Sequence, residues 1–403
     1  MHRRFVFCFP AAVLWLVFAV PTFASPTGEP ALDSKPVRMV LGFDNELTIG
    51  GHLPAFAYDG RKGISIGTMT DMGNGLARVV FPAEDTVVPP LYMFPPLTFA
   101  RVEIIPNDLV GWIDFCSGAA ELNFDARFVP RLFDATMADL TVVTALTTAE
   151  SAGEFKVLQG SPLDRLGDIQ LVGVARVPVT DDGFVNWLLQ LPTDAATDMK
   201  AHWDFPQGRF VCPGEQPVVA QRSKLTIGEE GRLRISRWPT FRYDPLGANV
   251  VGRVNWVADT VAHVSFPADQ LHIAPLKLLG SKVPSGIGVI IETNSLQGTI
   301  DICSGEANLA FDAVFTPYLF GRIWDTGISV VTDLTTNESS GFFREVQGEP
   351  IDDWGDGRLV GVAQVPLTDD EFINRFLRLP TDAVAELPAH IDIEGGREIC
   401  LGR

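Results

Sequence analysis

Alternation between apolar and polar residues is the main pattern along this chain. Within Glu121–Val129, every second residue is apolar, namely Leu122, Phe124, Ala126 and Phe128. Most of the residues between them are charged or polar. A period of two with a single apolar face indicates a β-strand that buries one side.

The same alternation predicts further short strands, separated by clusters of Gly, Pro, Asn and Asp. These strands span Ala77–Phe81, Phe99–Ile105, Val110–Phe115, Leu140–Leu146, Phe155–Leu158, Ile169–Val177 and Ala201–Phe205. Many short strands with frequent turns are typical of an antiparallel sandwich or a closed barrel. The pattern does not decide between these two.

One segment, residues 180–192, favours a helix instead. Thr180 or Asp181 is positioned to cap the first turn by accepting backbone N–H bonds, and Pro192 ends the helix. The stripe predicted to face the sheet consists of Phe184, Leu188 and Leu191. We expect this helix to close one end of the sheet or to cover an open edge.

The chain carries this whole pattern twice. The 25 residues from Leu171 and the 25 residues from Leu359 are identical at 18 positions, at a constant offset of 188. Further upstream, Gly111–Phe128 matches Gly298–Phe315 at an offset of 187, and the pentapeptide LTIGG at 47–51 aligns with LTIGE at 225–229. A period of this length indicates a duplicated domain rather than a solenoid of small repeats.

The predicted fold is mainly β, with two tandem homologous antiparallel β-barrel or β-sandwich domains. Each domain has one short helix near its C-terminal end. Copy one covers residues 38–212, a linker covers 213–224, and copy two covers 225–403. Each copy is long enough for a domain with its own core.

The N-terminal segment predicts export. Arg3 and Arg4 precede the apolar run Phe5–Val20. Thr22 and Ala24 then form a small-x-small cleavage site, so residues 1–24 are expected to be a cleaved signal peptide. An uncleaved signal anchor is the alternative. No later stretch is apolar for long enough to span a bilayer, so we expect no stable membrane span after cleavage. The predicted location is secreted or periplasmic.

Cleavage at this site would leave four cysteines: Cys116, Cys212, Cys303 and Cys400. Four cysteines allow three pairings. The repeat favours Cys116 with Cys212 and Cys303 with Cys400, because an ancestral single domain could bridge only within itself. A four-thiolate zinc site is the alternative, but the sequence contains no Cys-x-x-Cys pair.

The charge balance limits the partners. The net charge is −19, and it becomes more negative after cleavage because the leader contains Arg3 and Arg4 and no acidic residue. Phosphate backbones and anionic membrane surfaces repel such a chain, so a nucleic acid is not expected as a partner. The acids are scattered, which favours a solvated surface; cation binding is the alternative.

Two His–Asp pairs are the best candidates for chemistry. His202 lies two residues before Asp204, and His390 two residues before Asp392. This spacing places both side chains of a pair on one face of a strand. A carboxylate can orient an imidazole for base catalysis or metal ligation. The plainer interpretation is a solvent-exposed pair.

The aligned acidic residues are the second candidates. The fragment that contains Asp352, Asp353 and Asp356 distantly resembles a calcium loop but lacks its regular spacing and closing Glu. Calcium is therefore the cofactor that these acids would suit. The acids that align between the copies lie mostly beside Gly, Thr or Pro, where turns and helix caps favour them.

No motif in the chain names a reaction, which favours a non-enzymatic binding or interaction protein. Its ligand is expected to be a small apolar molecule inside a barrel or a protein partner. The apolar segment Val88–Leu97 is either a loop that covers the core or an exposed contact for such a partner. One alternative is an extracytoplasmic hydrolase that uses aligned carboxylates or the His–Asp pairs. Another is a cell-surface structural or adhesion module made bivalent by the repeat.

Overall fold

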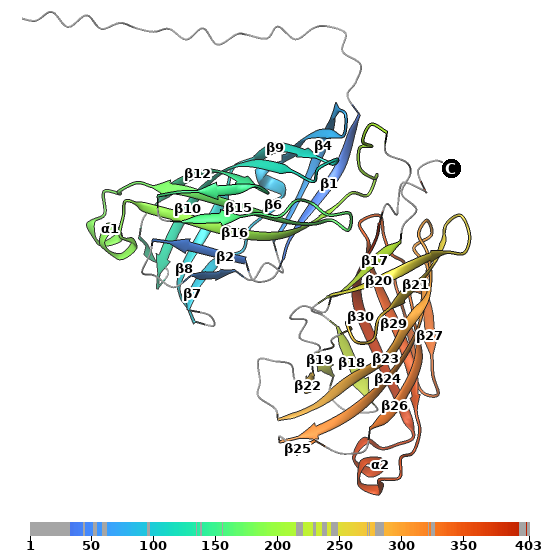
Figure 1. Ribbon diagram of the computed structural model, residues 1–403. Coiled ribbons are helices and arrows are strands. Elements are labelled where there is room, and N and C mark those ends of the chain that lie inside the picture. The colour runs from blue at the N-terminus through green and yellow to red at the C-terminus, as the bar shows by residue number, and fades with distance from the viewer. Residues whose placement is uncertain are drawn as a thin grey trace, which may run out of the picture. The chain divides into compact units, whose positions relative to one another are not determined.

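The computed structural model describes most of the chain after residue 32 (Figure 1). It covers residues 33–400 except 43–44, 51–54, 59–62, 95–96, 134, 138, 155, 215–220, 229–230, 236–239, 243–248, 272, 274, 279–285, 321, 324–326 and 395–399. The predicted signal peptide and half of the predicted linker, residues 215–220, lie outside the described residues. No helix in the described part is long and apolar enough to cross a membrane.

The described strands form two large antiparallel sheets, which confirms the predicted fold class. The first sheet contains β1 (Ser34–Leu41), β2 (Asn45–Ile49), β3 (Phe56–Tyr58), β4 (Ile64–Gly73), β5 (Leu76–Phe81), β6 (Thr86–Val87), β7 (Leu91–Phe94), β8 (Leu97–Pro106), β9 (Leu109–Asp114), β10 (Ala120–Leu132), β11 (Ala135–Thr136), β12 (Leu140–Thr147), β15 (Asp168–Val177) and β16 (Thr193–Asp204). Between β12 and β15, β13 (Glu150–Ala152) and β14 (Val157–Gln159) form a separate hairpin.

The second sheet repeats this arrangement. It contains β17 (Arg222–Ile227), β18 (Arg232–Ile235), β19 (Phe241–Arg242), β20 (Asn249–Trp256), β21 (Val261–Phe266), β22 (Leu276–Leu278), β23 (Ile287–Asp301), β24 (Ala307–Leu319), β25 (Arg322–Ile323), β26 (Ile328–Thr335), β29 (Asp356–Val365) and β30 (Thr381–Ile393). The corresponding separate hairpin is β27 (Glu338–Ser340) with β28 (Glu345–Gln347).

Each sheet closes on itself. In the first sheet, β1 pairs with β16 and so closes a ring through β4, β5, β9, β10, β12 and β15. A second closure joins β8 to β10. In the second sheet the equivalent closures are β17 with β30 and β23 with β24. The pairing therefore favours a closed barrel, the alternative that the sequence left open.

The interior of each ring is filled by its own apolar side chains. The buried hydrophobic residues form two separate clusters, one from each sheet. Trp203 is 1% exposed, and its ring meets the edge of Phe81 at a centroid distance of 5.5 Å. Among the described residues, one internal cavity of about 80 Å³ lies in the first sheet and one of about 70 Å³ in the second. Burial of this apolar surface is the main stabilising term in each sheet.

The strand register corrects one sequence alignment. Arg38 on β1 lies opposite Asp204, and Lys224 on β17 lies opposite Asp392, so these two strands correspond. The pentapeptide at 47–51 lies on and just after β2, which pairs with β16 as β18 pairs with β30. Its alignment with residues 225–229 was therefore wrong. A five-residue match carries little information where every strand shows the same alternation.

Both predicted disulfides are present. Cys116 bonds Cys212 and Cys303 bonds Cys400, with Cα–Cα distances of 5.6 and 5.5 Å. Each bridge joins the turn after β9 or β23 to the chain beyond the last strand of the same copy. The bridged cysteines are 96 and 97 residues apart in the sequence. In the chain-entropy model, a disulfide that closes a loop of this length stabilises the fold by on the order of 4 to 5 kcal/mol.

The described residues contain two α-helices, α1 (Gly183–Leu189) and α2 (Glu371–Leu377). Their N-caps are Asp182 and Asp370, whose carboxylates accept backbone N–H bonds, and not Thr180 or Asp181. The prediction of a buried stripe that includes Phe184 was also wrong. Val185 and Leu189 are buried, and Phe184 is 48% exposed. One residue turns a helix by about 100°, so an error of one position selects another face.

The antiparallel order gives each sheet two distinct ends. In the first sheet, β10 and β15 run the same way, so the turn after β10 and the α1 connection lie at one end, here called the helix end. The turn after β9 and the last residues of β16 lie at the other, here called the disulfide end. Figure 1 shows α1 and α2 each at one end of its own sheet.

Close strand approach explains a repeated glycine. A Cβ added at Gly111 would lie 1.9 Å from the carbonyl oxygen of Glu121, and one at Gly298 would lie 2.0 Å from that of Asn308. We expect Gly111→Ala to destabilise the protein by about 1–3 kcal/mol, because the strands must separate. Gly183→Ala is the matched control, since no atom lies within 4 Å of its added Cβ. Urea unfolding checks this, and equal midpoints would contradict the close approach.

Candidate functional site

The candidate site starts from the last residues of β16 and β30. His202 and Asp204 lie on one face of β16, as their spacing predicts. His202 pairs in register with Asp168, the first residue of β15. His390 and Asp392 repeat this on β30, and His390 pairs in register with Asp356 on β29. The sheet register thus places a second carboxylate beside each imidazole.

These second carboxylates orient the imidazoles. His202 Nδ1 lies 2.9 Å from Asp168 Oδ1, and His390 Nδ1 lies 2.9 Å from Asp356 Oδ1. The residue before each Asp is a glycine at positive φ, and a Cβ added at Gly167 would lie 2.7 Å from His202 Cε1. In each copy, the glycine therefore leaves room for the imidazole ring, and the aspartate that follows it binds Nδ1 of that ring.

The two imidazoles meet the two strand-end carboxylates at one centre. His202 Nε2 lies 3.1 Å from Oδ1 of both Asp204 and Asp392. His390 Nε2 lies 3.2 Å from Asp204 Oδ1 and 3.1 Å from Asp392 Oδ1. We call these four residues the His–Asp cluster. Two of them come from each copy, so neither copy forms the cluster alone.

Two cations surround the cluster. Arg38 donates from Nε to Asp204 Oδ2 at 2.6 Å, and from Nη1 to Asp356 Oδ2 of the other copy at 2.5 Å. Lys224, at the equivalent position of copy two, donates to Asp168 Oδ1 at 2.5 Å. Each cation therefore belongs to one copy and binds a carboxylate of the other copy. Arginine can bind two carboxylates in this way because its guanidinium is forked, whereas lysine carries one compact ammonium.

The cluster is largely buried. The side-chain exposures are 14% for His202, 16% for His390, 4% for Asp204 and 16% for Asp392. This corrects the plainer expectation of a solvent-exposed pair. Burial of a charge without compensation is costly, so the contacts within the cluster and to the two cations are required for it to exist.

The surroundings shift the pKa of each histidine upward. Burial by itself would lower the pKa of His202, but attraction to Asp392 and hydrogen bonds to Asp168, Asp204 and Asp392 outweigh burial and raise it to about 10. The pKa of His390 is raised well above its ordinary value by the equivalent contacts, again against the effect of burial. When protonated, each ring can donate from both nitrogens to carboxylates.

The pKa values of the carboxylates shift downward. Burial would raise the pKa of Asp204 and of Asp392, but the hydrogen bonds and the attraction from both histidines hold both pKa values well below the ordinary range. Burial likewise opposes the lowering at Asp168 and Asp356, where the adjoining histidine and cation outweigh it. These acids are therefore ionised at neutral pH.

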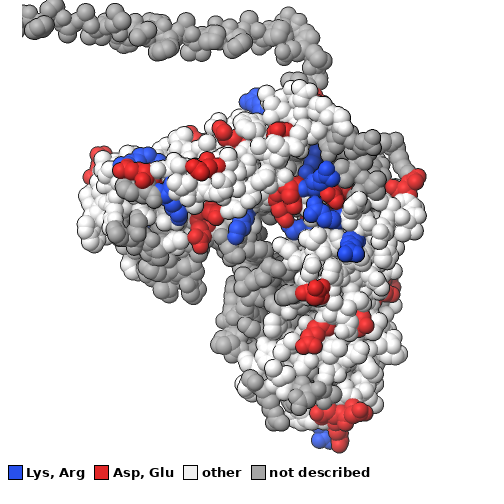
Figure 2. Space-filling view, viewed as in Figure 1, with Lys and Arg blue, Asp and Glu red and all other residues white. Residues whose placement is uncertain are grey.

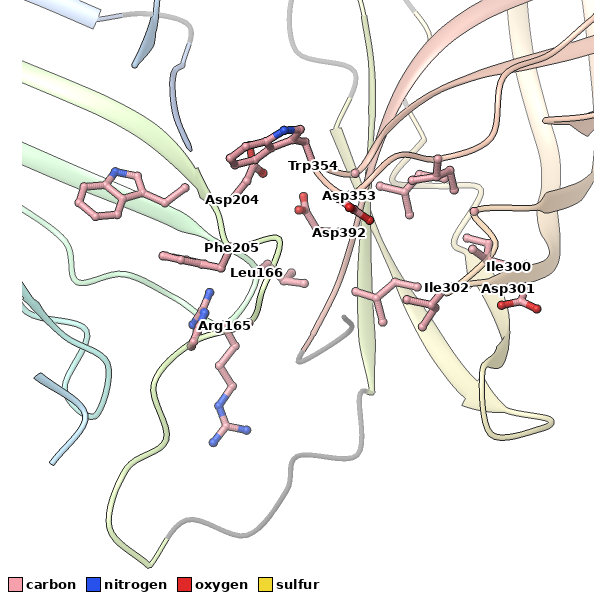
Figure 3. A pocket seen from close by; sticks show the side chains of 18 residues that line it. Arg165, Leu166, Asp204, Phe205, Ile300, Asp301, Ile302, Asp353, Trp354 and Asp392 are labelled. Atoms are coloured by element: carbon pink, nitrogen blue, oxygen red, sulfur yellow. The ribbon is translucent and has the colours of Figure 1, made fainter. Parts of the chain in front are cut away.

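A small pocket adjoins the cluster. Its volume is about 110 Å³, and its walls include Asp204, Asp392 and Trp354. Figure 3 shows Asp204 and Asp392 on strands of different copies, with Trp354 near them. The pocket has room for a few water molecules but is small for an organic substrate.

The arrangement offers no nucleophile and no unoccupied base. Both nitrogens of each imidazole face carboxylates. The serines next to the disulfides serve turns: Ser117 donates its hydroxyl to Asp114, and Ser304 Oγ accepts a backbone N–H in the equivalent turn. The cluster is therefore suited to holding charges or an ion, and poorly suited to acid–base or covalent catalysis.

The fragment with the distant likeness to a calcium loop contains a turn. Asp352 Oδ1 accepts the backbone N–H groups of Trp354 and Asp356, which is the ordinary role of an aspartate in a turn. Asp356 binds His390 and Arg38. In the described part of the chain, the residues whose ligand atoms group closely enough to share a metal ion are those of the His–Asp cluster, and Asp352, Asp353 and Asp356 are not among them.

Several other aligned acids accept backbone N–H groups in turns and at helix caps. Asp114 and Asp301 accept backbone N–H groups in the disulfide turns. The buried Asp382 accepts the backbone N–H groups of Phe342 and Phe343. On the visible face in Figure 2, the described Asp and Glu residues lie singly or in small groups with Lys and Arg among them. The strongly negative net charge therefore does not gather on that face.

Sequence reasoning found the His–Asp pairs but missed that they meet. It also missed Arg38 and Lys224, because the wrong pentapeptide alignment hid their equivalence. Asp168 and Asp356 align between the copies, but nothing in the sequence links them to the histidines. The chain matches no protein family model and no curated protein.

The shifted pKa values predict how stability depends on pH in metal-free protein. A raised histidine pKa contributes stability that is complete below pH 6.5 and is lost as pH rises through about 10. For His202 this corresponds to roughly 5 kcal/mol at most. The lowered aspartate pKa values act oppositely, so their contribution is lost as pH falls below about 4.

We therefore expect the urea midpoint of chelator-treated protein to fall steadily between pH 7 and pH 10. The double variant His202→Gln and His390→Gln provides the control, because it lacks both titrating rings and its midpoint should change much less over this range. A wild-type midpoint that stays constant from pH 7 to pH 10 would contradict the protonated cluster.

Proposed function

We propose that this chain is an exported, duplicated, non-enzymatic binding protein that holds a protein partner through the helix ends of its two copies. The observation that supports this most directly is a pair of exposed phenylalanines that recurs in both copies at equivalent positions. These are Phe133 with Phe184 in copy one, and Phe320 with Phe372 in copy two.

Phe133 and Phe320 are the strongest part of this observation. They are 75% and 79% exposed and adopt φ angles of 46° and 47°. A bulky residue at positive φ is strained, and an exposed phenyl ring contributes little to the core. The same costly conformation in both copies is explained if the two rings contact something outside the chain.

Other exposed apolar residues lie nearby in the fold. In copy one, Trp187 on α1 is 73% exposed and its ring lies 5.9 Å from that of Phe184. In copy two, Phe342 and Phe343 are 65% and 74% exposed, and their backbone binds Asp382 near the start of β30, toward the helix end. Grouped aromatic residues at a surface are typical of protein interfaces.

Two other versions of the function have less support. The internal cavities of about 80 and 70 Å³ are well below the roughly 300–1,000 Å³ of most ligand sites, so an apolar ligand inside a barrel is disfavoured. A hydrolase is disfavoured because the cluster offers no nucleophile or unoccupied base. The net charge of −19 favours a protein partner over an anionic membrane or a nucleic acid.

Export is supported by the disulfides, because such bonds persist in oxidising compartments. The N-terminal apolar run of the sequence supports the same conclusion. Repetition of the helix end in two copies supports a bivalent attachment, in which the second contact forms at a raised effective concentration.

Site-specific photocrosslinking tests this function. Benzoylphenylalanine replaces Phe184 or Phe372 at the helix ends, and Val143 or Val331, which are 65% and 67% exposed on the outer face of each sheet, as matched controls. In the extracytoplasmic fraction of the producing organism, we expect one protein to crosslink from both helix ends but not from the control positions, and unlabelled wild-type chain to suppress it. Equal labelling from all four positions, or crosslinks only to a second copy of the chain, would refute the proposed partner.

A further inference from the structure

We propose that the His–Asp cluster binds one divalent transition-metal ion of the zinc class, with His202 Nε2, His390 Nε2, Asp204 Oδ1 and Asp392 Oδ1 as its four ligands. This proposal is independent of the helix-end function. The argument rests on the positions of the four atoms, the groups behind them, and the charge of the whole assembly.

The four atoms have the spacing of a metal site. They all lie within 4.8 Å of one another. The four neighbouring nitrogen–oxygen distances are 3.1 to 3.2 Å. A tetrahedral zinc ion with bonds of about 2.0–2.2 Å holds its ligands about 3.3–3.5 Å from one another. These four nitrogen–oxygen separations are therefore within a few tenths of an ångström of those around a tetrahedral ion.

The groups behind the histidines match a metal site as well. Each Nδ1 lies 2.9 Å from a carboxylate, Asp168 or Asp356, which leaves Nε2 directed at the centre. A carboxylate behind a ligating imidazole is the usual outer partner of histidine metal ligands, because it fixes the ring and raises its basicity. This feature occurs twice, once in each copy.

The charges also balance with one divalent ion. Asp168, Asp204, Asp356 and Asp392 contribute four negative charges, and Arg38 and Lys224 contribute two positive ones. With both imidazoles neutral, a charge of −2 remains, which one divalent cation cancels. Two protons cancel it equally well, so the imidazolium form and the metal-bound form are alternative states of the same centre.

Lys224 binds fewer carboxylates than its counterpart Arg38 does. Its ammonium binds Asp168 in the other copy, whereas its counterpart Arg38 also binds the carboxylate next to it in the sheet. Among the described residues, no group donates a hydrogen bond to the buried Asp392 Oδ2. A buried carboxylate oxygen without a donor is costly, and a cation on this carboxylate offsets that cost.

The ligand types select the metal. Two imidazoles favour zinc and related transition ions, whereas calcium prefers six to eight oxygen ligands. Four protein ligands complete a tetrahedral shell, which is the form of structural rather than catalytic zinc sites. With two ligands from each copy, the ion would fasten the two copies to each other.

The test uses the full mature chain after dialysis against a chelator. Isothermal titration at pH 7 with zinc chloride should give one ion per chain, and calcium chloride should give no comparable binding. His390→Gln should weaken zinc affinity by more than about 100-fold, and Asp168→Asn by about 10–100-fold. His263→Gln is the matched control, since this half-buried histidine on β21 lies outside the cluster.

Cobalt substitution covers the case in which a variant does not fold. Wild-type protein with one equivalent of cobalt should show the intense visible absorption of tetrahedral cobalt, and zinc should displace it. Zinc binding that survives in folded His390→Gln, or wild-type protein that binds neither zinc nor cobalt, would overturn the proposal. Neither result bears on the helix-end crosslinks, so the two proposals fail separately.

Discussion

Two largely buried carboxylates and two half-exposed ones meet at one small junction, and the groups around them compensate their negative charge. Asp204 and Asp392 bring the charge inward at the ends of their strands, and Asp168 and Asp356 hold the histidines from behind. The two histidines and the cations Arg38 and Lys224 supply the opposite charge. Because removal of one partner from a buried ion pair is strongly destabilising, these groups depend on one another.

This charge compensation links the two copies of the unit. Each copy has its own closed sheet, its own apolar core and its own disulfide. Each also supplies half of the His–Asp cluster and a cation for a carboxylate of the other copy. The cores stabilise the copies separately, whereas the cluster acts between them.

Local patterns in the sequence predicted the local structure well. The alternation at Glu121–Val129 places β10 because half-buried strands have a period of two, and the repeat paired the cysteines because it limits each bridge to one copy. The helix was placed correctly, but its N-cap at Asp182 was not, and the buried face was therefore wrong. The cluster could not be predicted, because the meeting of His202 with Asp392 depends on how two separate sheets pack and leaves no trace in either local pattern.

A double-mutant cycle between Arg38 and Asp356 tests the central claim, since these residues belong to different copies and bond directly. The unfolding free energies of wild type, Arg38→Gln, Asp356→Asn and the double variant would be measured in urea at pH 7 with chelator present. The account predicts a coupling of about 0.5–3 kcal/mol, as is usual for residues in one charge network. Strictly additive changes in unfolding free energy would show that Arg38 and Asp356 do not interact across the two copies, and would contradict the account.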